Sequence, residues 1–391
     1  MTKLEQLIEE LCPNGVEYLK IGEVVNYEQP SKYIVNSTDY NDDFDVPVLT
    51  AGQTFVLGYT NEKSGIYNAS KEAPVIIFDD FTGAFKWVDF PFKVKSSAMK
   101  ILTVNDRKTY IRYIFHVMGH IGYSSTEHKR LWIGLYSECE IPVPPLPVQS
   151  EIVRILDNFT ELTAELTAEL TARKQQYAHY RDTLLKLDNN APSYTLKDVC
   201  LSIADGDHMP PPKADSGVPF ITISNITETK QIDFSNVMYV PRDYYDKIAD
   251  KRKAKRDDIL YTVVGSFGIP VHISSKTEFV FQRHIAILRP NQQRIVPRYM
   301  YHIMQSTEFY KQADKAAKGA AQRTIGLSSL GNMTIPLPSI EEQKRIVAIL
   351  DRFDTLCNDI SAGLPAEIEA RQKQYEYYRD KLLTFKELIA N

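Results

Sequence analysis

Two short acidic segments carry the residue types of a catalytic or metal site. Asp205, Asp207 and His208 lie within ADGDH, where they could bind a metal ion or exchange protons. Asp79 and Asp80 follow the apolar run APVIIF, where paired carboxylates could act as acid and base. Both patterns are also typical of polar turns, and we favour the turn in each case.

The chain lacks the sequence motifs of common catalytic and nucleotide sites. It contains no GxxxxGK[ST], no GxGxxG and no HExxH. The NPP[FY] and DPP[FY] motifs of amino-methyltransferases are missing, as is the PD dipeptide of PD-(D/E)xK nucleases. The four cysteines are far apart and form no CxxC pair, which argues against zinc ribbons and disulfide scaffolds. The sequence therefore shows no credible catalytic constellation, metal site or cofactor site.

Basic residues are concentrated in a few segments, although the formal net charge is −4. Lys and Arg can contact phosphates, and Arg and Gln can read base edges. A solvated charged surface is the alternative explanation for such segments. If the chain binds DNA, it must do so through local patches or together with a basic partner. The candidate DNA-binding residues are Lys86, Lys100, Lys129, Arg130, Lys253, Arg256, Gln282, Arg283, Lys318, Gln322 and Arg323.

Length and composition indicate a globular protein. The chain has 391 residues, of which 43% are hydrophobic and 25% are charged, enough for two or three domains. No apolar run approaches the length needed to span a bilayer. The start, MTKLEQLIEEL, is acidic and amphipathic rather than a signal peptide, so we expect a cytoplasmic protein without membrane contact.

The sequence contains an internal repeat. QSEIVRILD at 149–157 matches QKRIVAILD at 343–351, and each follows a proline-rich lead. RKQQYAHYRDTLL matches RQKQYEYYRDKLL, and RYIFHVM matches RYMYHIM. EHKRLWIG and AQRTIG occupy corresponding places, so both halves carry basic residues just before the strand that leads to the helix. Because all matches keep their order, we infer an internal duplication.

Each half is predicted to end in a long helix. Apolar and aromatic residues recur at alternating spacings of four and three along both segments, as in a coiled coil. The second segment shifts phase near Gly363 and Pro365, which predicts a break there. The candidate coiled-coil and spacer residues are Leu162, Leu166, Leu170, Tyr177, Tyr180, Leu350, Phe353, Tyr375 and Tyr378.

Connectivity predicts how the helices pair. The second globular region begins where the first helix ends and leads into the start of the second helix. An antiparallel pair places these two points together. The expected fold class is α+β, with two mixed α/β domains separated by two long antiparallel coiled-coil helices and related by an internal pseudo-two-fold repeat. The expected segments are a first domain with a short N-terminal helix at 1–148, a central helix at 149–188, a second domain at 189–342 and a C-terminal helix at 343–391.

The pattern resembles a known family. A variable region, then IPVPPLPVQSEIVRILDNF or IPLPSIEEQKRIVAILDRF, then a helix ending RKQQYAHYRDTLL or RQKQYEYYRDKLL, is similar to the specificity subunits of type I restriction–modification systems. The resemblance covers essentially the whole chain. TAEL repeats, seen here in TELTAELTAELTAR at 160–173, are also a feature of this family.

The resemblance implies a function. Two target-recognition domains would each read one half of a bipartite, asymmetric site in double-stranded DNA. The helices would set the spacer and dock two methyltransferase subunits, which bind S-adenosylmethionine, and motor-nuclease subunits could join them. This chain would bind no cofactor and have no catalysis of its own.

Three alternatives stay open at this point. A single-chain methyltransferase or nuclease conflicts with the missing motifs. A coiled-coil adaptor that binds only proteins conflicts with the basic segments found in both halves. A specificity subunit of a methylation-only defence system would have the same sequence features.

The number of TAEL units suggests a way to set the length of the central helix. Sixteen positions separate Asp157 from Arg173, and 20 separate Asp351 from Arg371, so the arms differ by one four-residue unit. One unit adds about 6 Å and about 40° to a helix. One DNA base pair adds about 3.4 Å and turns about 35°. We therefore expect the number of units to set the length of the unread spacer.

Overall fold

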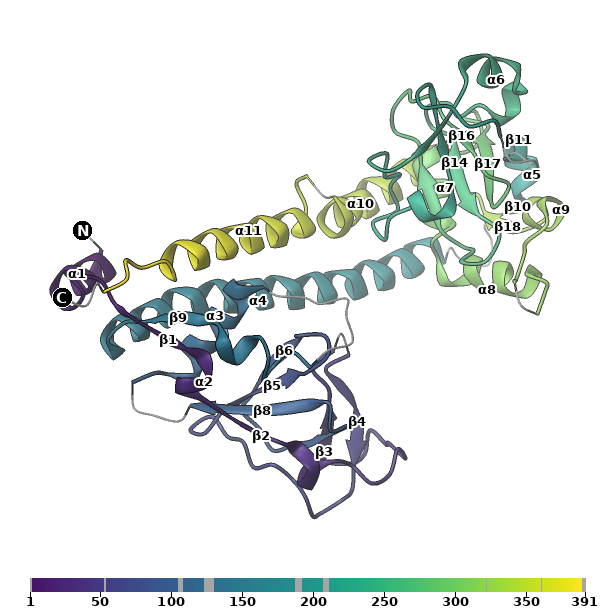
Figure 1. Ribbon diagram of the computed structural model, residues 1–391. Coiled ribbons are helices and arrows are strands. Elements are labelled where there is room, and N and C mark those ends of the chain that lie inside the picture. Colours follow the sequence, from purple (N-terminus) through teal and green to yellow (C-terminus); the bar gives the residue numbers. More distant parts are fainter. Residues whose placement is uncertain are drawn as a thin grey trace. The chain divides into compact units, whose positions relative to one another are not determined.

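The computed structural model describes residues 2–52, 54–104, 108–122, 130–186, 192–206, 211–320, 322–359 and 361–388. The chain divides into two compact units (Figure 1). The first contains Met1–Ala164 and Ala370–Asn391, and the second contains Glu165–Glu369. Two helices, α4 (Leu146–Leu185) and α11 (Leu364–Leu382), contribute residues to both units.

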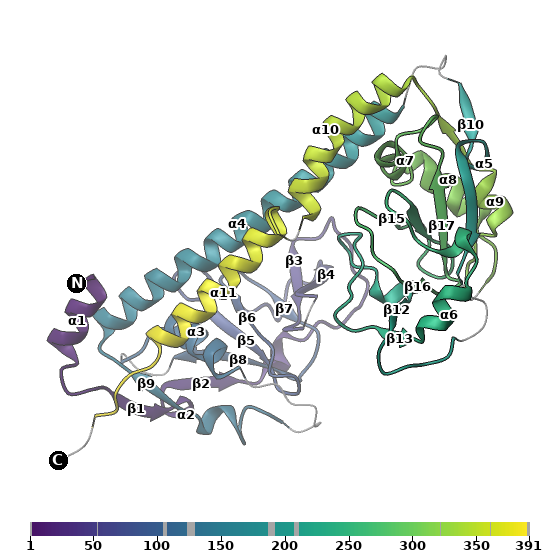
Figure 2. The same cartoon turned by 90° about the horizontal axis from the view of Figure 1, so that it is seen from above.

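The described residues of the first unit form three antiparallel or mixed sheets. Its central sheet has the order β2-β8-β5-β6, a second has the order β4-β3-β7, and β1 pairs with β9 (Figure 2). The strands are β1 (Glu17–Lys20), β2 (Val25–Glu28), β3 (Val46–Leu49), β4 (Val56–Thr60), β5 (Val75–Asp79), β6 (Phe85–Val88), β7 (Lys93–Val94), β8 (Met99–Val104) and β9 (Glu140–Val143). The helices that lie wholly in this unit are α1 (Lys3–Leu11), α2 (Ile21–Val24), η1 (Pro30–Tyr33), α3 (Ile111–Ile121) and η2 (Tyr136–Glu138).

The second unit repeats this plan. Its sheets have the orders β11-β17-β14-β15, β13-β12-β16 and β10-β18. The strands are β10 (Ser193–Thr195), β11 (Cys200–Asp205), β12 (Val218–Ile221), β13 (Met238–Val240), β14 (Ile259–Thr262), β15 (Pro270–His272), β16 (Val280–Phe281), β17 (Ile285–Pro290) and β18 (Thr334–Pro336). The helices are α5 (Leu196–Val199), η3 (Ile223–Asn225), α6 (Arg242–Lys247), η4 (Asp250–Arg252), α7 (Pro297–Ile303), α8 (Thr307–Ala316), α9 (Leu327–Gly331) and α10 (Ile340–Asn358).

The pairing of strands confirms the duplication. The central sheet of each unit is antiparallel throughout. The three-stranded sheet of each unit contains one parallel pair, β3 with β7 in the first and β12 with β16 in the second. The two halves of the sequence therefore encode the same topology, although few residues of the strands match.

The inner strands of the central sheets are buried on both faces, which explains their unbroken apolar runs. In β5, Ile76 and Phe78 pack into one core with α3, whereas Val75 and Ile77 pack into another with Leu49. Strand side chains alternate between faces, so a strand between two cores needs apolar residues at every position. In the second unit, Ala286 and Leu288 of β17 face one core, and Ile285 and Ile287 face the other.

The helices follow the sequence closely. Helix α4 is continuous over 40 residues and includes the whole TELTAELTAELTAR segment. The predicted break is confirmed, because α10 ends at Asn358 and α11 begins at Leu364. Helix α1 is capped by Thr2, whose hydroxyl accepts from Glu5 N at 3.2 Å, and it packs with Leu383 near the C-terminus. Among the described residues, no helix is long and apolar enough to span a membrane.

The helical residues singled out in the sequence contact partners within each unit. In the first unit, Phe159 stacks on Tyr378 of α11, with ring centroids 5.2 Å apart. In the second unit, α10 lies beside residues 165–185 of α4, and Phe353 stacks on Tyr177 and Tyr180 (Figures 1 and 2). Leu350 is buried and Leu170 packs against the same core, whereas Leu162 and Leu166 are half-buried.

Candidate nucleic-acid interface

A four-residue clamp fixes the short helix of the first domain to the long helices. We call Arg112, His116, Asp157 and Tyr375 the first clamp. Asp157 Oδ1 lies 2.8 Å from both Arg112 Nε and His116 Nε2. Tyr375 OH lies 3.1 Å from His116 Nδ1. When Nε2–H donates to the carboxylate, the other nitrogen of a neutral imidazole, Nδ1, can accept from the tyrosine hydroxyl.

The second domain has the same arrangement. The second clamp consists of Arg298, His302, Asp351 and Tyr177. Asp351 Oδ1 lies 2.6 Å from both Arg298 Nη2 and His302 Nε2, and Tyr177 OH lies 2.9 Å from His302 Nδ1. Asp354 accepts a further bond from Arg298 Nη2 at 2.8 Å.

Each clamp takes its tyrosine from the other repeat. Tyr375 lies in the second repeat but completes the clamp of the first domain, whereas Tyr177 lies in the first repeat and completes the clamp of the second. The tyrosine of each repeat therefore contacts the histidine of the other repeat and not the histidine of its own. Each domain is held by both long helices.

The clamps are electrostatically alike. Burial lowers the pKa of His116 and of His302, which keeps both rings neutral. Burial alone would raise the pKa of Asp157 and Asp351, but hydrogen bonds from the histidine and arginine of each clamp outweigh it and lower both pKa values. Both carboxylates are therefore ionised at neutral pH.

A buried glutamine stands at the start of each long helix. Gln149 Nε2 donates to the carbonyls of Pro144 at 2.7 Å and Lys108 at 2.8 Å. Gln343 Nε2 does the same with Pro338 at 3.0 Å and Arg294 at 3.2 Å. These bonds fix the proline-rich lead to the short helix, so the repeated Gln and Asp positions have a structural role.

In the first domain, Asp79 and Asp80 shape a rigid turn, which confirms the turn interpretation. Asp79 Oδ1 accepts from Phe81 N and Thr82 N, both at 2.9 Å. Asp80 Oδ2 lies 3.0 Å from Lys100 Nζ, and both side chains are almost fully buried. We call residues 79–83, at the end of the β5–β6 hairpin, the first tip.

This ion pair corrects the assignment of Lys100 as a DNA contact. Lys100 is 1% exposed and is committed to Asp80, so its ammonium cannot reach a phosphate. The same carboxylate also accepts from Trp132 N at 2.9 Å. Lys100 therefore anchors the tip rather than binding DNA.

The other first-domain candidates lie nearer the surface. Arg130 is exposed, and the following residue, Leu131, donates from N to Asp80 O at 2.8 Å, which places Arg130 beside the first tip. Lys86 is half-buried in β6, next to Trp87, which packs against the core and under the guanidinium of Arg112. Lys129 lies outside the described residues.

In the second domain the corresponding tip carries an aromatic stack. We call residues 263–268, at the end of the β14–β15 hairpin, the second tip. Phe267 stacks on Tyr310 of α8 with centroids 5.9 Å apart and an angle of 12°. The guanidinium carbon of Arg323 lies 5.1 Å from the centroid of the Phe267 ring, and Arg323 Nη1 pairs with Asp314 at 2.6 Å.

The predicted residues around this stack are brought together. Arg323 O accepts from Gly265 N at 3.0 Å, and Lys318 pairs with Thr324 through two backbone bonds of 2.9 and 2.8 Å. Lys318 and Gln322 are exposed. One surface of the second domain thus combines Lys318, Gln322, Arg323 and the aromatic stack.

The remaining second-domain candidates are more dispersed. Arg283 is exposed and Gln282 is half-buried at the end of β16, where Gln282 N donates to Ile221 O at 3.0 Å. Lys253 Nζ donates to Asp246 O at 3.0 Å and lies over the ring of Tyr245, and Arg256 is exposed.

The basic run that contains Lys253 and Arg256 is partly neutralised by nearby carboxylates. Lys247 pairs with Asp243 at 3.1 Å, and Lys255 pairs with Asp250 at 2.8 Å. These pairs reduce its potential for phosphate binding.

The ADGDH segment shows an ion pair in its described part. Asp205 lies 3.4 Å from Arg252 Nη2, whereas Asp207 and His208 lie outside the described residues. Across the part of the chain that the structure describes, no group of three or more His, Cys, Asp or Glu side chains could hold a metal ion.

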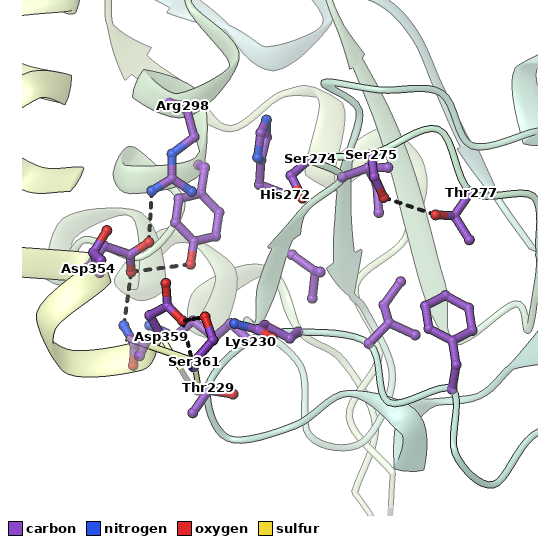
Figure 3. A pocket seen from close by; sticks show the side chains of 18 of the residues that line it. Thr229, Lys230, His272, Ser274, Ser275, Thr277, Arg298, Asp354, Asp359 and Ser361 are labelled. Atoms are coloured by element: carbon purple, nitrogen blue, oxygen red, sulfur yellow. Dashed lines mark hydrogen bonds and ion pairs between the residues drawn. The ribbon is translucent and has the colours of Figure 1, made fainter. Parts of the chain in front are cut away.

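A pocket of about 540 Å³ opens in the second unit between the loop at 229–234, β15 and the end of α10 (Figure 3). Figure 3 shows Arg298 and Asp354 pointing toward one another at one side. Burial lowers the pKa of Lys230, in the same wall, to about 8. Because Asp354 and Asp359 line the pocket together with these cations, it offers no uniformly positive surface for a phosphate.

The sequence interpretation missed the clamps and the buried ion pairs. RYIFH and RYMYH were recognised only as matching helices, although the spacing of Arg and His in both copies was the available signal. A second buried pair, Lys93 with Glu62 at 2.7 Å, joins residues on separate strands and loops and has no sequence signature.

Comparisons with known proteins agree with this architecture. The type I restriction modification DNA specificity domain matches residues 13–173 and 190–370. The chain is 42% identical to the EcoR124I/EcoR124II specificity subunit of Escherichia coli over 98% of this chain and 97% of that one. It is 30% identical to a putative type I restriction enzyme specificity subunit of Haemophilus influenzae over 98% of each chain.

Solved structures share the fold. The S subunit of a type I restriction–modification system from M. genitalium aligns with a TM-score of 0.58 and 13% identity, over 94% of this chain and 96% of that one. A chain from a structural study of the assembly and conformational transition of a type I restriction–modification system aligns with a TM-score of 0.53 and 17% identity, over 95% and 98%.

The duplicated domains and repeated helices thus define a DNA specificity subunit. The chain belongs to the specificity subunits of type I restriction–modification systems.

Proposed function

We propose that this chain recognises a bipartite, asymmetric site in double-stranded DNA, with one half-site read by each domain. The observation that carries the proposal is that the same clamp occurs in both domains and that a hairpin tip lies at the corresponding place in each, whereas the turns and side chains of the two tips differ. Equal scaffolds with unequal contact residues fit a site whose halves differ in sequence.

The long helices would hold the two readers at a defined separation. The exchange of tyrosines between repeats supports an antiparallel coiled-coil pair with an internal pseudo-two-fold axis, because each clamp requires both helices. The TELTAELTAELTAR segment lies in the uninterrupted part of α4 between Asp157 and Tyr177, where added turns would change this separation.

Catalysis would come from partner subunits. The relatives are named as specificity subunits of type I restriction enzymes. By analogy, this chain would dock two methyltransferase subunits, which bind S-adenosylmethionine, and would join motor-nuclease subunits through them. The chain itself would supply DNA recognition and no catalytic group. We expect the complex to act in the cytoplasm.

Single-molecule methylome sequencing tests the proposal. A host that expresses the chain with its methyltransferase partner should carry a bipartite methylated motif that disappears when the chain is deleted. Restoring the chain should restore the same motif. A methylome that does not change on deletion would contradict the proposed function.

A further inference from the structure

The first tip presents an apolar ring on an unusually well-supported turn. Phe81 is 40% exposed, although large apolar side chains are ordinarily buried. Asp79 N donates to Ala84 O at 2.8 Å, and Gly83 N donates to Asp79 O at 3.0 Å, which closes the turn. The two bonds from Phe81 N and Thr82 N to the Asp79 carboxylate fix the backbone on either side of the ring.

The support extends below the turn. Asp80, the residue before Phe81, is 1% exposed and is held by Lys100, by the Trp132 amide and by the Ala98 carbonyl. A phenylalanine with this much support loses little backbone freedom when a partner covers it, so its apolar surface contributes fully to binding. Its structure is that of a preorganised contact rather than a loose surface residue.

The second domain also carries an aromatic ring in the turn of the corresponding hairpin, although not at the position equivalent to Phe81. The second tip is closed by Thr262 N with Ile269 O at 3.1 Å and by Gly268 N with Thr262 O at 3.0 Å. Phe267 lies there between Arg323 and Tyr310, and Tyr310 is 47% exposed. Gly268 has φ +97°, and a Cβ there would lie 2.9 Å from the Tyr310 ring, so the chain is shaped around this stack.

The charges near the tips indicate what covers them. Exposed Arg130 stands beside the first tip. Lys318 and Gln322 stand beside the second, together with Arg323, whose charge is balanced by Asp314 at 2.6 Å. Cationic side chains next to an exposed ring are the pattern of nucleic-acid binding, in which phosphates meet the cations and bases meet the ring. The Asp79 carboxylate at the base of the first tip would repel a phosphate, which favours bases rather than the DNA backbone as the partner of the ring.

We propose that Phe81 is a base-contacting wedge of the first domain, which inserts its ring against a base step of the first half-site, and that the Phe267–Tyr310 stack is its counterpart in the second. Apolar side chains inserted at base steps distort the duplex locally and favour steps that unstack easily. The wedge would therefore contribute to specificity without hydrogen bonds to base edges. This inference rests on the proposed recognition of a bipartite site.

The test uses the full chain in complex with its methyltransferase subunits and a duplex that carries the methylated motif. Phe81→Ala should weaken binding to this duplex about tenfold, because stacking between an aromatic side chain and a base is lost. The salt dependence of binding should stay unchanged, since no phosphate contact is removed. Phe81→Trp should bind within about twofold of the wild type, because it restores an aromatic surface.

Two controls separate the wedge from other effects. Arg130→Ala should lower the salt slope by about one, as expected for a phosphate contact. Phe234→Ala changes a phenylalanine of similar exposure, 38%, in the other domain and should leave affinity unaltered. The thermal unfolding temperature of each variant shows whether its fold is intact.

A fluorescent base analogue locates the contact. When 2-aminopurine is placed in turn at each position of the first half-site, the wild-type complex should change its fluorescence at the step that Phe81 contacts, apart from any base that a methyltransferase subunit flips out, and Phe81→Ala should abolish only the change at that step. Wild-type affinity for the motif in a folded Phe81→Ala complex, or a reduced salt slope in that variant, would overturn the inference. The absence of any bipartite motif with the wild-type chain would instead refute the proposed function.

Discussion

At the scale of single residues, the buried pair of Lys100 and Asp80 shows how one domain supports its tip. The second domain has Ala286 and Val263 at the same places. Ala286 lies opposite Tyr261 as Lys100 lies opposite Phe78, and Val263 O accepts from Ile325 N as Asp80 O accepts from Leu131 N, both at 2.8 Å. The same scaffold therefore holds either an ion pair or an apolar pair.

We predict that Lys100→Met destabilises the first unit by about 3 kcal/mol, because it leaves the Asp80 carboxylate buried without its cation. The double variant Lys100→Ala with Asp80→Val, which copies the second domain, should be less destabilised than Lys100→Met. Urea unfolding measures both. Equal losses in the two variants would show that the pair matters for its packing rather than for its charge.

A second buried pair predicts an acid-sensitive first domain. Hydrogen bonding from Lys93, opposed by burial, lowers the pKa of Glu62 from its ordinary value of 4.5 to about 2. Because the folded-state pKa is below the unfolded one, this carboxylate stabilises the fold above about pH 4.5, and the stabilisation is lost as the pH falls toward 2.

Glu62→Gln should remove this pH dependence and should lower stability at neutral pH by about 2 kcal/mol, since it takes the opposite charge away from the buried Lys93 ammonium, which keeps its hydrogen bond to Ser64 O at 2.8 Å. Thermal unfolding between pH 7 and pH 3 measures both effects. A variant whose stability falls with acid as steeply as that of the wild type would argue against this pair as the source.

At the scale of elements, the clamps decide how each short helix meets the long ones. Asp351→Ala should destabilise the second unit by about 2 kcal/mol, because it removes the acceptor for Arg298 and His302. Tyr177→Phe should cost about 1 kcal/mol, since it removes one hydrogen bond to His302.

Glu342→Ala is the matched control for the clamp. Glu342 is a carboxylate on the same helix, and it pairs with Arg345 at the surface at 2.7 Å. Its loss should change stability much less than Asp351→Ala does, because ion pairs at the surface contribute little. Unfolding in guanidinium chloride should find the largest loss of stability for Asp351→Ala, a smaller loss for Tyr177→Phe and the smallest for Glu342→Ala. A loss for Glu342→Ala as large as that for Asp351→Ala would contradict the structural role of the second clamp.

The break between α10 and α11 depends on a glycine. A Cβ at Gly363 would lie 2.5 Å from Thr355 O and 2.6 Å from Asp359 O, which are backbone atoms with little freedom to move. We predict that Gly363→Ala costs about 1–3 kcal/mol. Gly326→Ala is the control, because a Cβ there would meet no atom within 4 Å, and urea unfolding should find it nearly neutral.

At the scale of the whole molecule, the uninterrupted α4 predicts the effect of changing its length. Inserting one TAEL unit at 160–173 adds about 6 Å and about 40° to the helix. We expect the unread spacer of the methylated motif to lengthen while both half-sites keep their sequences, because neither domain is altered. Methylome sequencing determines the spacer and both half-sites in one experiment. Altered half-site sequences would contradict the hypothesis that the TAEL units set the spacer length.

Much of this architecture could be predicted from the sequence, for identifiable reasons. Repeated motifs such as QSEIVRILD and QKRIVAILD expose the duplication directly. The break at Gly363 and Pro365 follows from local backbone chemistry. The turn at Asp79 and Asp80 likewise depends on neighbours along the chain, so its prediction is confirmed.

The sequence by itself determined the repeated topology, the continuous central helix, its broken counterpart and the family. Only the tertiary structure decided that Tyr375 completes the clamp of the first domain and Tyr177 that of the second, and that Lys100 is buried against Asp80 instead of facing DNA. The physical reason is that helix periodicity and turn formation depend on residues that are close together in the sequence. The partner of a charged or polar side chain depends on which distant segments the fold brings within about 3 Å.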